Sequence, residues 1–333
     1  MTQSRILVTG AGGFIGHHLV KRLKAEGNWV RGADIKMPEY ENSAADEFAT
    51  LDLRKYENCL LATHGGVDRV YNLAADMGGI GYITTNLADI SRNNILINVN
   101  MLEASRQNAI KRFLFSSSAC VYAQGKQLSP VVKPLVEEDA YPADPEPGYG
   151  WEKLFAEEMG KYYRRDFGLA TYSVRFHNVY GPLGTYHGGK EKAPAAISRK
   201  IAMAADGGEI EIWGDGEQTR SFMYVDDCVE GLIRLMASDH HDALNLGADR
   251  LVSINQLVDM VCKVAGKKLV KRHDRSKPQG VRGRNSDNTR LNRVLGWEPS
   301  ITLETGLEVT YKWIEGELKK AGRVPTQTHK AVA

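Results

Sequence analysis

The sequence has few cysteines and places none of them where a disulfide framework or a metal site would need them. Cys59, Cys120, Cys228 and Cys262 stand far apart in the 333 residues, with no C-x-x-C pair and no histidine at metal-ligand spacing. Disulfide scaffolds and zinc sites both depend on clustered ligands. We therefore expect no metal site, and we expect free thiols that serve either core packing or chemistry.

The chain also lacks an excess of charge of either sign and a long apolar run. Lysine and arginine number 43 against 41 aspartates and glutamates, so the formal net charge is +2. This balance excludes a strong field that would steer the protein to nucleic acid or to anionic membranes. No uninterrupted apolar stretch approaches the roughly 20 residues of a membrane span. We expect a cytoplasmic protein with neither a nucleic acid nor a membrane as partner.

Strand-like and helical patterns alternate along the first half of the chain. Short runs rich in β-branched residues are typical of buried parallel strands, and they occur at residues 6–9, 30–33, 67–73, 113–116 and 171–176. Helical periodicity is present at residues 14–25 and 86–108, and again at 225–236, 255–265 and 303–320. The alternation predicts an α/β fold with a Rossmann-type doubly wound parallel sheet.

A glycine-rich turn lies between the first expected strand and the first expected helix. Gly10, Gly13 and Gly16 have the spacing G-x-x-G-x-x-G, with Phe14 and Ile15 between the last two. Residues without a Cβ let backbone N–H groups and the helix N-terminus approach a pyrophosphate. A lone glycine motif is a weak signal, but its place between strand and helix favours a dinucleotide site over an empty turn.

Asp34 ends the second expected strand, at the spacing where an acidic residue bonds the adenosine ribose of a dinucleotide. A carboxylate accepts hydrogen bonds from the ribose 2′-hydroxyl and repels a 2′-phosphate. Arg31 and Lys36 lie nearby and would soften this preference. The sequence therefore predicts NAD as the cofactor in preference to NADP.

The pattern becomes less regular after about residue 176, where prolines and glycines interrupt it. We expect residues 1–176 to form the NAD-binding domain, with residues 221–250 returning to it. Residues 177–220 and 251–322 would form a smaller, interleaved C-terminal substrate-binding region. The polar end, 323–333, is expected to fray.

A tyrosine and a lysine four residues apart stand at the head of a helical segment. The spacing places Tyr149 and Lys153 on one helical face. A phenol, with a pKa near ~10, needs a nearby cation to act as a base at neutral pH. Ser118 ends the strand-like run before them. Together the three resemble the Ser, Tyr and Lys group of the short-chain dehydrogenases. The resemblance implies that Ser118 holds a substrate hydroxyl, that Tyr149 takes its proton and that the hydride passes to NAD.

These motifs together resemble the short-chain dehydrogenases, in particular their extended branch. Longer runs resemble the GDP-mannose 3,5-epimerases over nearly all of the chain from Arg5 to Leu318, at residues 74–79, 117–120, 175–178, 189–194, 213–220 and 280–288. The resemblance implies a GDP-sugar substrate and conversion of GDP-mannose to GDP-L-galactose, with GDP-L-gulose as the alternative product of exchange at carbon 5 alone. The implied route is oxidation at carbon 4, proton exchange at carbons 3 and 5, and re-reduction by the bound NADH.

The resemblance also implies an acid/base pair, Cys120 and Lys192. Cys120 would remove the ring protons, which a carbon 4 ketone acidifies because either carbanion delocalises as an enolate. Lys192 would return protons on the other face of the ring. A buried cysteine considered alone is more often a small hydrophobe, but Cys120 follows Ser118 by two residues. Its thiolate needs a nearby positive charge, which Lys153 or Lys192 would supply.

Further contacts are implied by position in the family pattern. For the cofactor they are Asp52 and Leu73, in addition to the residues of the glycine turn, Asp34, Tyr149 and Lys153. For the nucleotide sugar they are Gly78, Ser118, Ala119, Cys120, Asn178, Glu191, Lys192, Ala193, Lys200, Gln218, Arg220, Arg282 and Arg284. Arginine forks suit phosphate oxygens, and either Arg282 or Arg284 is the principal diphosphate contact. A homodimer is implied through the segments 86–108 and 149–165.

Three other functions fit the same scaffold. A 4,6-dehydratase would have an acidic residue close after the serine motif, where this chain has Ala119, Cys120 and Val121. A simple 4-epimerase would not require Cys120 with Lys192. A non-catalytic NAD-binding regulatory protein would be expected to lack part of the Ser, Tyr and Lys group, which is complete here.

Overall fold

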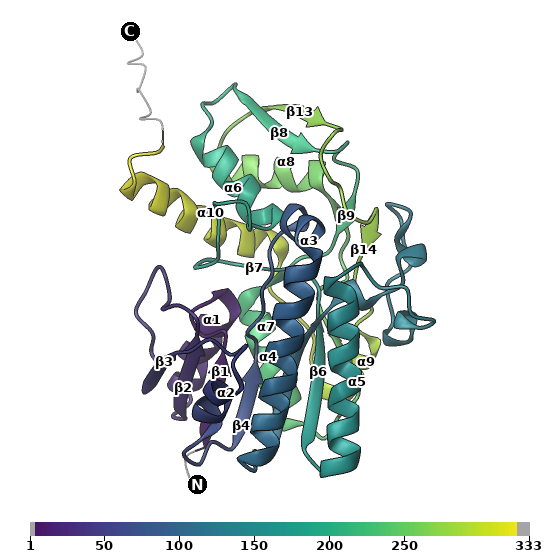
Figure 1. Cartoon of the computed structure of the whole chain (residues 1–333). Coiled ribbons are helices and arrows are strands. Elements are labelled where there is room, and N and C mark those ends of the chain that lie inside the picture. Colours follow the sequence, from purple (N-terminus) through teal and green to yellow (C-terminus); the bar gives the residue numbers. More distant parts are fainter. Residues whose placement is uncertain (1–3, 325–333) are drawn as a thin grey trace.

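A parallel sheet of seven strands forms the larger body of the computed structural model, which describes residues 4–324 (Figure 1). Its strands are β1 (Arg5–Thr9), β2 (Trp29–Asp34), β3 (Glu47–Thr50), β4 (Arg69–Asn72), β5 (Arg112–Ser118), β6 (Ala170–Phe176) and β11 (Leu244–Leu246). The spatial order is β11-β6-β5-β4-β1-β2-β3, so the chain winds outward in both directions from β1. This confirms the predicted doubly wound fold.

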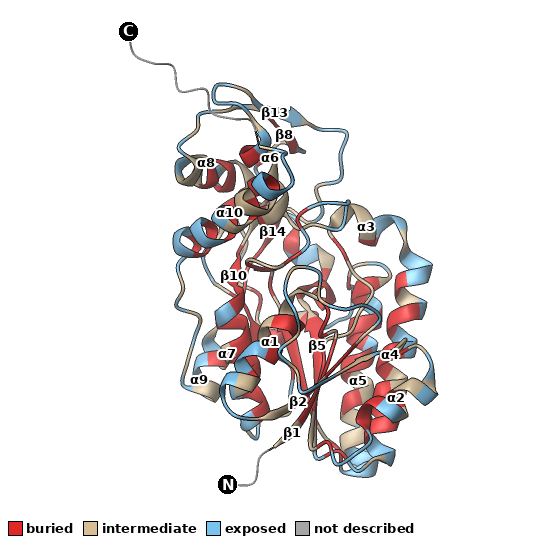
Figure 2. Ribbon diagram, turned by 90° about the vertical axis from the view of Figure 1, so that its left-hand side faces the viewer, coloured by how far each residue is buried: buried red, intermediate tan, exposed pale blue. Residues whose placement is uncertain are grey.

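Helices cover both faces of this sheet (Figure 2). One face carries α1 (Phe14–Ala25) and α7 (Val225–Ala237), and the other carries α2 (Tyr56–Thr63), α4 (Leu87–Gln107) and α5 (Tyr149–Phe167). Successive side chains of a strand point to opposite faces. In β1, Ile6 and Val8 accordingly join the hydrophobic cluster that contains Leu19 of α1, whereas Leu7 joins the one that contains Met101 of α4.

A smaller region lies above the ends of the strands in Figure 1. Its helices are α3 (Ile80–Thr85), α6 (Ala193–Met203), α8 (Ile254–Ala265) and α10 (Leu303–Lys320). The short helix α9 (Thr289–Leu295), between α8 and α10 in the chain, packs instead beside β11 of the main sheet. Three small sheets pair β7 (Val179–Tyr180) with β10 (Met223–Tyr224), β8 (Glu209–Trp213) with β13 (Val270–Asp274), and β9 (Thr219–Arg220) with both β12 (Val252–Ser253) and β14 (Gly283–Arg284). Single 3-10 turns, η1 (Ala119–Val121), η2 (Gln124–Gln127) and η3 (Glu137–Ala140), follow β5. Within residues 4–324, no helix has both the length and the apolarity to cross a membrane.

The long periodic helices agree with their sequence-based bounds to within a residue, but two strands of the sheet were not predicted. β3 is short and partly exposed, so it has no continuous apolar run. β11 is buried but has only three residues. The expected fraying of residues 323–333 falls almost entirely on 325–333, which lie outside the described residues.

A buried ion pair joins α5 to β6 beneath the carboxyl ends of the strands. Glu157 accepts from Arg175 Nε at 2.9 Å and from Nη2 at 2.7 Å, and the two side chains are 1% and 3% exposed. Ser117 of β5 donates to the same carboxylate at 2.5 Å, and Arg175 Nη1 donates to the Glu137 carbonyl at 2.6 Å. These additional hydrogen bonds satisfy the two charges, which is the condition under which a buried pair is tolerated.

Replacing Glu157 by Gln should lower the free energy of unfolding by about 3–5 kcal/mol, because Arg175 would keep a buried charge without its counter-ion. Urea unfolding followed by circular dichroism measures the change. Glu308→Gln, which removes the exposed partner of Lys312 in α10, is the matched control and should leave the midpoint nearly unchanged. If the two variants lost the same free energy of unfolding, the buried pair would contribute no more to stability than the exposed one, contrary to this prediction.

Candidate active site

The turn between β1 and α1 leaves no room for side chains at its glycines. Gly10 has φ of 68°, and a Cβ there would lie 2.8 Å from the carbonyl carbon of Leu73. A Cβ at Gly16 would lie 2.1 Å from the carbonyl oxygen of Gly10. Gly13 precedes Phe14 as the N-cap residue and has no side chain to cap α1, so the first amide groups of the helix are free to bind a pyrophosphate. This cradle fits NAD.

Asp34 lies against the same turn. Its carboxylate accepts hydrogen bonds from the backbone N–H of Gly12 at 2.9 Å and of Lys36 at 3.1 Å. Burial raises the pKa of Asp34, and these backbone hydrogen bonds partly offset the rise. A carboxylate placed here suits a ribose with free hydroxyls and opposes a 2′-phosphate.

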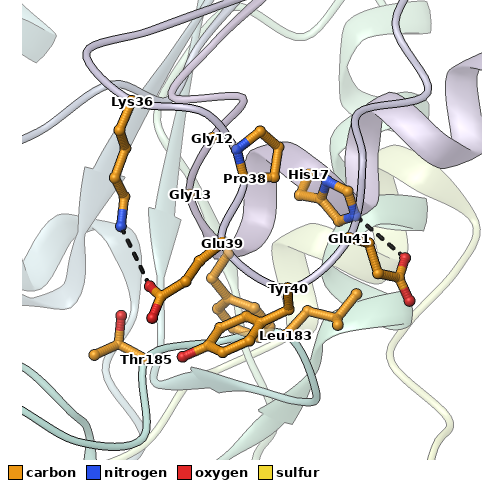
Figure 3. A pocket seen from close by; sticks show the side chains of 11 residues that line it. Gly12, Gly13, His17, Lys36, Pro38, Glu39, Tyr40, Glu41, Leu183 and Thr185 are labelled. Atoms are coloured by element: carbon orange, nitrogen blue, oxygen red, sulfur yellow. Dashed lines mark hydrogen bonds and ion pairs between the residues drawn. The ribbon is translucent and has the colours of Figure 1, made fainter.

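A pocket adjoins the turn (Figure 3). Three segments line it: the turn with Gly12 and Gly13, the loop of residues 36–41 that follows β2, and Leu183 with Thr185 after β7. Two contacts lie at its edges: a hydrogen bond between His17 Nε2 and Glu41 Oε2 at 3.4 Å, and an ion pair between Lys36 Nζ and Glu39 Oε2 at 3.7 Å. The cradle therefore has an open cavity directly beside it.

The two other expected cofactor contacts occupy different surroundings. Leu73 follows β4. Its N–H donates to Thr9 Oγ1 at 3.1 Å, and Thr9 immediately precedes Gly10. Asp52 is paired with Arg54, whose Nε and Nη2 each lie 2.8 Å from a carboxylate oxygen. The Asp52 side chain therefore already has a cationic partner in this structure.

Ser118, Tyr149 and Lys153 come together where β5 ends and α5 begins. Gly148, with φ of 70°, turns the chain so that Tyr149 is the first residue of α5. Lys153 Nζ lies 5.4 Å from the centroid of the Tyr149 ring. Burial and the charge of Glu152 raise the pKa of Tyr149, whereas a hydrogen bond from Ser118 lowers it. Burial lowers the pKa of Lys153.

Glu152 is a buried acid beside this group that the sequence analysis missed. Its Oε1 lies 3.7 Å from Lys153 Nζ and 2.9 Å from Asn94 Nδ2, and its Oε2 lies 3.4 Å from Asn98 Nδ2. The charge of Glu152 raises the pKa of Lys153 and so opposes the effect of burial. Adjacent helical residues do not normally share a face, so no sequence pattern predicts that Glu152 and Lys153 meet.

Cys120 lies in η1, directly after β5. Its N–H donates to Ser118 Oγ at 3.2 Å, its carbonyl accepts from the N–H of Glu146 at 3.0 Å, and its Sγ lies 3.4 Å from Arg284 Nη1. Burial raises the pKa of the Cys120 thiol, the charge of Glu146 raises it further, and the charge of Arg284 lowers it. The cation in contact with the sulfur is thus Arg284, whereas the sequence pointed to Lys153 or Lys192.

Lys192 is the half-buried residue at the N-cap of α6. Burial lowers the pKa of Lys192, and a charge on Cys120 would raise it, so the two side chains lie within electrostatic range of each other. A lysine whose pKa is lowered gives up its proton more readily, which suits a group that donates and accepts a proton.

Two of the three predicted arginines lie within electrostatic range of Cys120. Burial and the charge of Arg284 lower the pKa of Arg220 to about 9, and a charge on Cys120 would raise it. Arg284 is buried in β14 against the sulfur. Arg282 instead donates to Asp215 Oδ1 at 3.0 Å and to Gln279 Oε1 at 2.7 Å. The structure thus separates the two arginines that the sequence could not distinguish.

The remaining predicted substrate contacts differ in whether their polar groups already have partners within the protein. Lys200 donates to the carbonyl and the carboxylate of Glu211 on β8 at 3.0 and 3.2 Å. Gln218 is buried, and its Oε1 has no hydrogen-bond partner among the described residues. Two more have polar partners, since Asn178 donates to the Ser221 carbonyl and Glu191 forms an ion pair with Arg199. The last three have no polar side chain: Gly78 lies under Tyr82, Ala119 is buried in η1 and Ala193 begins α6. Within residues 4–324, no group of three or more potential ligands is arranged to hold a metal ion.

The chain is similar to curated plant enzymes over most of its length. It is 50% identical over 318 residues to GDP-mannose 3,5-epimerase of Arabidopsis thaliana, covering 95% of this chain and 83% of that protein. It is 49% identical over the same length, with the same coverage, to GDP-mannose 3,5-epimerase 1 of Oryza sativa subsp. japonica.

Solved structures of sugar-nucleotide enzymes share the fold. The UDP-glucose 4-epimerase of Thermotoga maritima, solved with UDP-glucose, has a TM-score of 0.85 and 28% identity, and the match covers 94% of this chain and 99% of that one. The UDP-glucuronic acid 4-epimerase of Bacillus cereus, solved with UDP-glucuronic acid and NAD, has a TM-score of 0.80 and 26% identity, with the same coverage of both chains.

The profile of the NAD dependent epimerase/dehydratase family matches residues 6–247, a span that includes the glycine turn, Asp34, Cys120 and the Tyr149 to Lys153 pair. NAD is therefore the cofactor of this chain, and the glycine turn fits it. From the extent of this match and the identity to its relatives, the chain belongs to the NAD-dependent epimerase/dehydratase family of enzymes.

Proposed function

We propose that this enzyme is a GDP-mannose 3,5-epimerase. The observation that carries the proposal is the position of Cys120, within the same buried site as Ser118 and Tyr149 and within electrostatic range of Lys192. Identity of 50% to the enzyme of that name from Arabidopsis thaliana supports the choice of substrate. The reaction converts GDP-mannose to GDP-L-galactose, and exchange at carbon 5 alone would give GDP-L-gulose.

The redox half of the reaction belongs to Ser118, Tyr149 and Lys153. NAD supplies the hydride acceptor for carbon 4 and, once reduced, the donor that reverses the step. Ser118 holds the sugar 4-hydroxyl and Tyr149 takes its proton. A phenolate in this buried place requires a cation, which Lys153 provides, and Glu152 keeps Lys153 protonated.

The epimerising half belongs to Cys120 and Lys192. Once carbon 4 is a ketone, the protons on carbons 3 and 5 are acidic, and the Cys120 thiolate removes them. Lys192 delivers a proton to the opposite face of the ring, and its lowered pKa makes the ammonium a stronger acid for this step. Tyr149 and Ser118 stabilise the enolate oxygen that develops at carbon 4.

The smaller region supplies the nucleotide contacts in this proposal. Residues 177–220 and 251–322 form the substrate-binding region, while 221–250 returns to the NAD-binding domain through α7 and β11. Arg220, with Arg284 beside it, suits a diphosphate because guanidinium forks donate paired hydrogen bonds. Gln218 offers an unpartnered carbonyl oxygen to the same ligand.

Exchange with solvent separates this function from its alternatives. Incubation with GDP-mannose in deuterated water, followed by mass and NMR analysis of the sugar, should place deuterium at carbons 3 and 5. A 4,6-dehydratase would instead lose water, and a 4-epimerase would change the configuration at carbon 4 without incorporating deuterium. No change to the sugar would favour a non-catalytic NAD-binding protein, and any of these three results would overturn the proposal.

Replacing Cys120 by Ala should slow incorporation of deuterium about 10²- to 10⁴-fold, because the base that removes the ring protons is gone. Oxidation at carbon 4 should persist, so NADH absorbance should still appear when GDP-mannose is added. Cys262→Ala, at a partly buried position in α8, is the matched control and should exchange at the wild-type rate. Full-speed exchange in Cys120→Ala would disprove the role of the thiol.

We also propose that the protein works in the cytoplasm with reduced thiols. All four cysteines are free, and Cys120 must stay reduced to act as a base.

A homodimer through α4 and α5 completes the proposal. The two helices pack against each other along one side of the molecule (Figure 1). They expose large apolar side chains, among them Leu96, Trp151, Phe155 and Tyr162. A two-fold axis would bring this face against its own copy and bury these side chains in a four-helix arrangement.

Replacing Leu96 or Phe155 by Arg should convert the dimer to a monomer, because each substitution places a charge in the proposed apolar contact. Light scattering coupled to gel filtration measures the mass directly. Val270→Arg, which changes an exposed apolar residue of β13 in the smaller region, should leave the mass unchanged. A wild-type chain that runs as a monomer would refute the dimer.

A further inference from the structure

We propose that Arg284 is the counter-ion of the Cys120 thiolate and that Gln127 is a positioning residue that holds its guanidinium against the sulfur. In the same proposal, the carboxylate of Glu146 opposes the effect of Arg284 on the thiol. The proposal rests on the proposed function, because it concerns the base of that reaction. It gives Arg284 a role beyond the diphosphate contact expected from the sequence.

Every nitrogen of the Arg284 guanidinium has a partner in one small buried cluster. Nη1 lies 3.4 Å from Cys120 Sγ, Nε donates to Gln127 Oε1 at 2.5 Å, and Nη2 lies 3.7 Å from Glu146 Oε2. The guanidinium is planar and rigid, so three contacts around its edge fix both its position and its orientation. A fixed, desolvated cation beside a thiol favours the thiolate.

Gln127 is itself held in place. It ends η2, is 1% exposed, and its Nε2 donates to the carbonyls of Tyr122 and Ala123 at 3.2 and 3.3 Å. These two bonds direct the Oε1 atom of Gln127 toward Arg284. The Gln127 carbonyl also accepts from the N–H of Arg282 at 2.9 Å, which ties η2 to the start of β14. Gln127 therefore aligns the guanidinium without touching the sulfur.

Glu146 acts on the thiol in the opposite direction. Its N–H donates to the Cys120 carbonyl at 3.0 Å, so its backbone is fixed next to the cysteine, and its carboxylate competes for the Arg284 charge. Burial raises the pKa of Cys120 most, Glu146 adds to the rise, and Arg284 lowers it. The acidity of the thiol thus depends on the balance between one cation and one anion.

Other titratable groups act on Cys120 from neighbouring elements, and none of them is changed in the variants that test the proposal. Tyr149 and Lys153 belong to α5, Lys192 precedes α6, and Arg220 belongs to β9. These groups are the same in every variant. If the midpoint of the thiol titration shifts in opposite directions in the Arg284 and Glu146 variants, the shifts can therefore be attributed to those two residues.

The thiol titration of the NAD-bound holoenzyme without substrate tests the proposal. The rate of Cys120 alkylation by iodoacetamide is followed across a pH series by mass analysis of the Cys120 peptide, and thiolate absorbance relative to Cys120→Ser gives a second measure. Arg284→Met should raise the midpoint by about one to two pH units, because the thiolate loses its cation. Gln127→Met should raise it by less, and Glu146→Gln should lower it.

The Cys262 peptide serves as an internal control whose profile should not change, because this thiol lies in α8 outside the cluster. An unchanged midpoint in Arg284→Met, with a weaker apparent affinity for GDP-mannose, would show that Arg284 serves the diphosphate alone and would overturn the proposal. If Arg284→Met fails to fold, a rise in the midpoint of Glu146→Gln would overturn it as well.

This titration needs no turnover, so it separates the two proposals. Opposite midpoint shifts in an enzyme that incorporates no deuterium from solvent would support the counter-ion while rejecting the 3,5-epimerase. Deuterium incorporation together with unchanged midpoints would support the 3,5-epimerase and reject the counter-ion role of Arg284.

Discussion

Desolvation is the constraint on which this site depends. Burial raises the pKa of Cys120 and Tyr149 and lowers the pKa of Lys153 and Lys192. Without compensation all four groups would be driven toward their neutral forms. Glu152 beside Lys153 and Arg284 beside Cys120 oppose the effect of burial on two of these groups. The same absence of water strengthens both interactions.

The arrangement follows from the topology of the sheet. Parallel strands end at one edge, and β5 delivers Ser118 and then Cys120 to that edge, where α5 presents Tyr149 and Lys153. The 4-epimerase of Thermotoga maritima shares this fold with a TM-score of 0.85, so the sheet alone does not determine which carbon is altered. In the proposed function, the distinction lies in side chains that project from short elements such as η1 and the start of α6.

What could be read from the sequence was local. The glycine turn, the helix Phe14–Ala25 and the pair of Tyr149 and Lys153 each depend on residues within one or two helical turns of each other. Arg284 and Cys120 are 164 positions apart, and no periodicity or spacing connects them. Glu146 lies in a loop without a pattern, and β11 is too short to produce one. Resemblance to a known family identified Cys120 and Lys192, and only the folded chain shows which charges surround the sulfur.

The sulfur of Cys120 and the guanidinium of Arg284, which form the proposed ion pair, belong to different parts of the fold. Cys120 follows a strand of the main sheet, and Arg284 lies in the two-residue strand β14 of the smaller region. In this proposal, the charge that opposes the rise in the Cys120 pKa is therefore a property of the assembled molecule. If β14 came loose, whether on the way to the native state or through local opening, the sulfur would lose that charge. Ionisation of the thiol would then be tied to the docking of the smaller region on the main sheet.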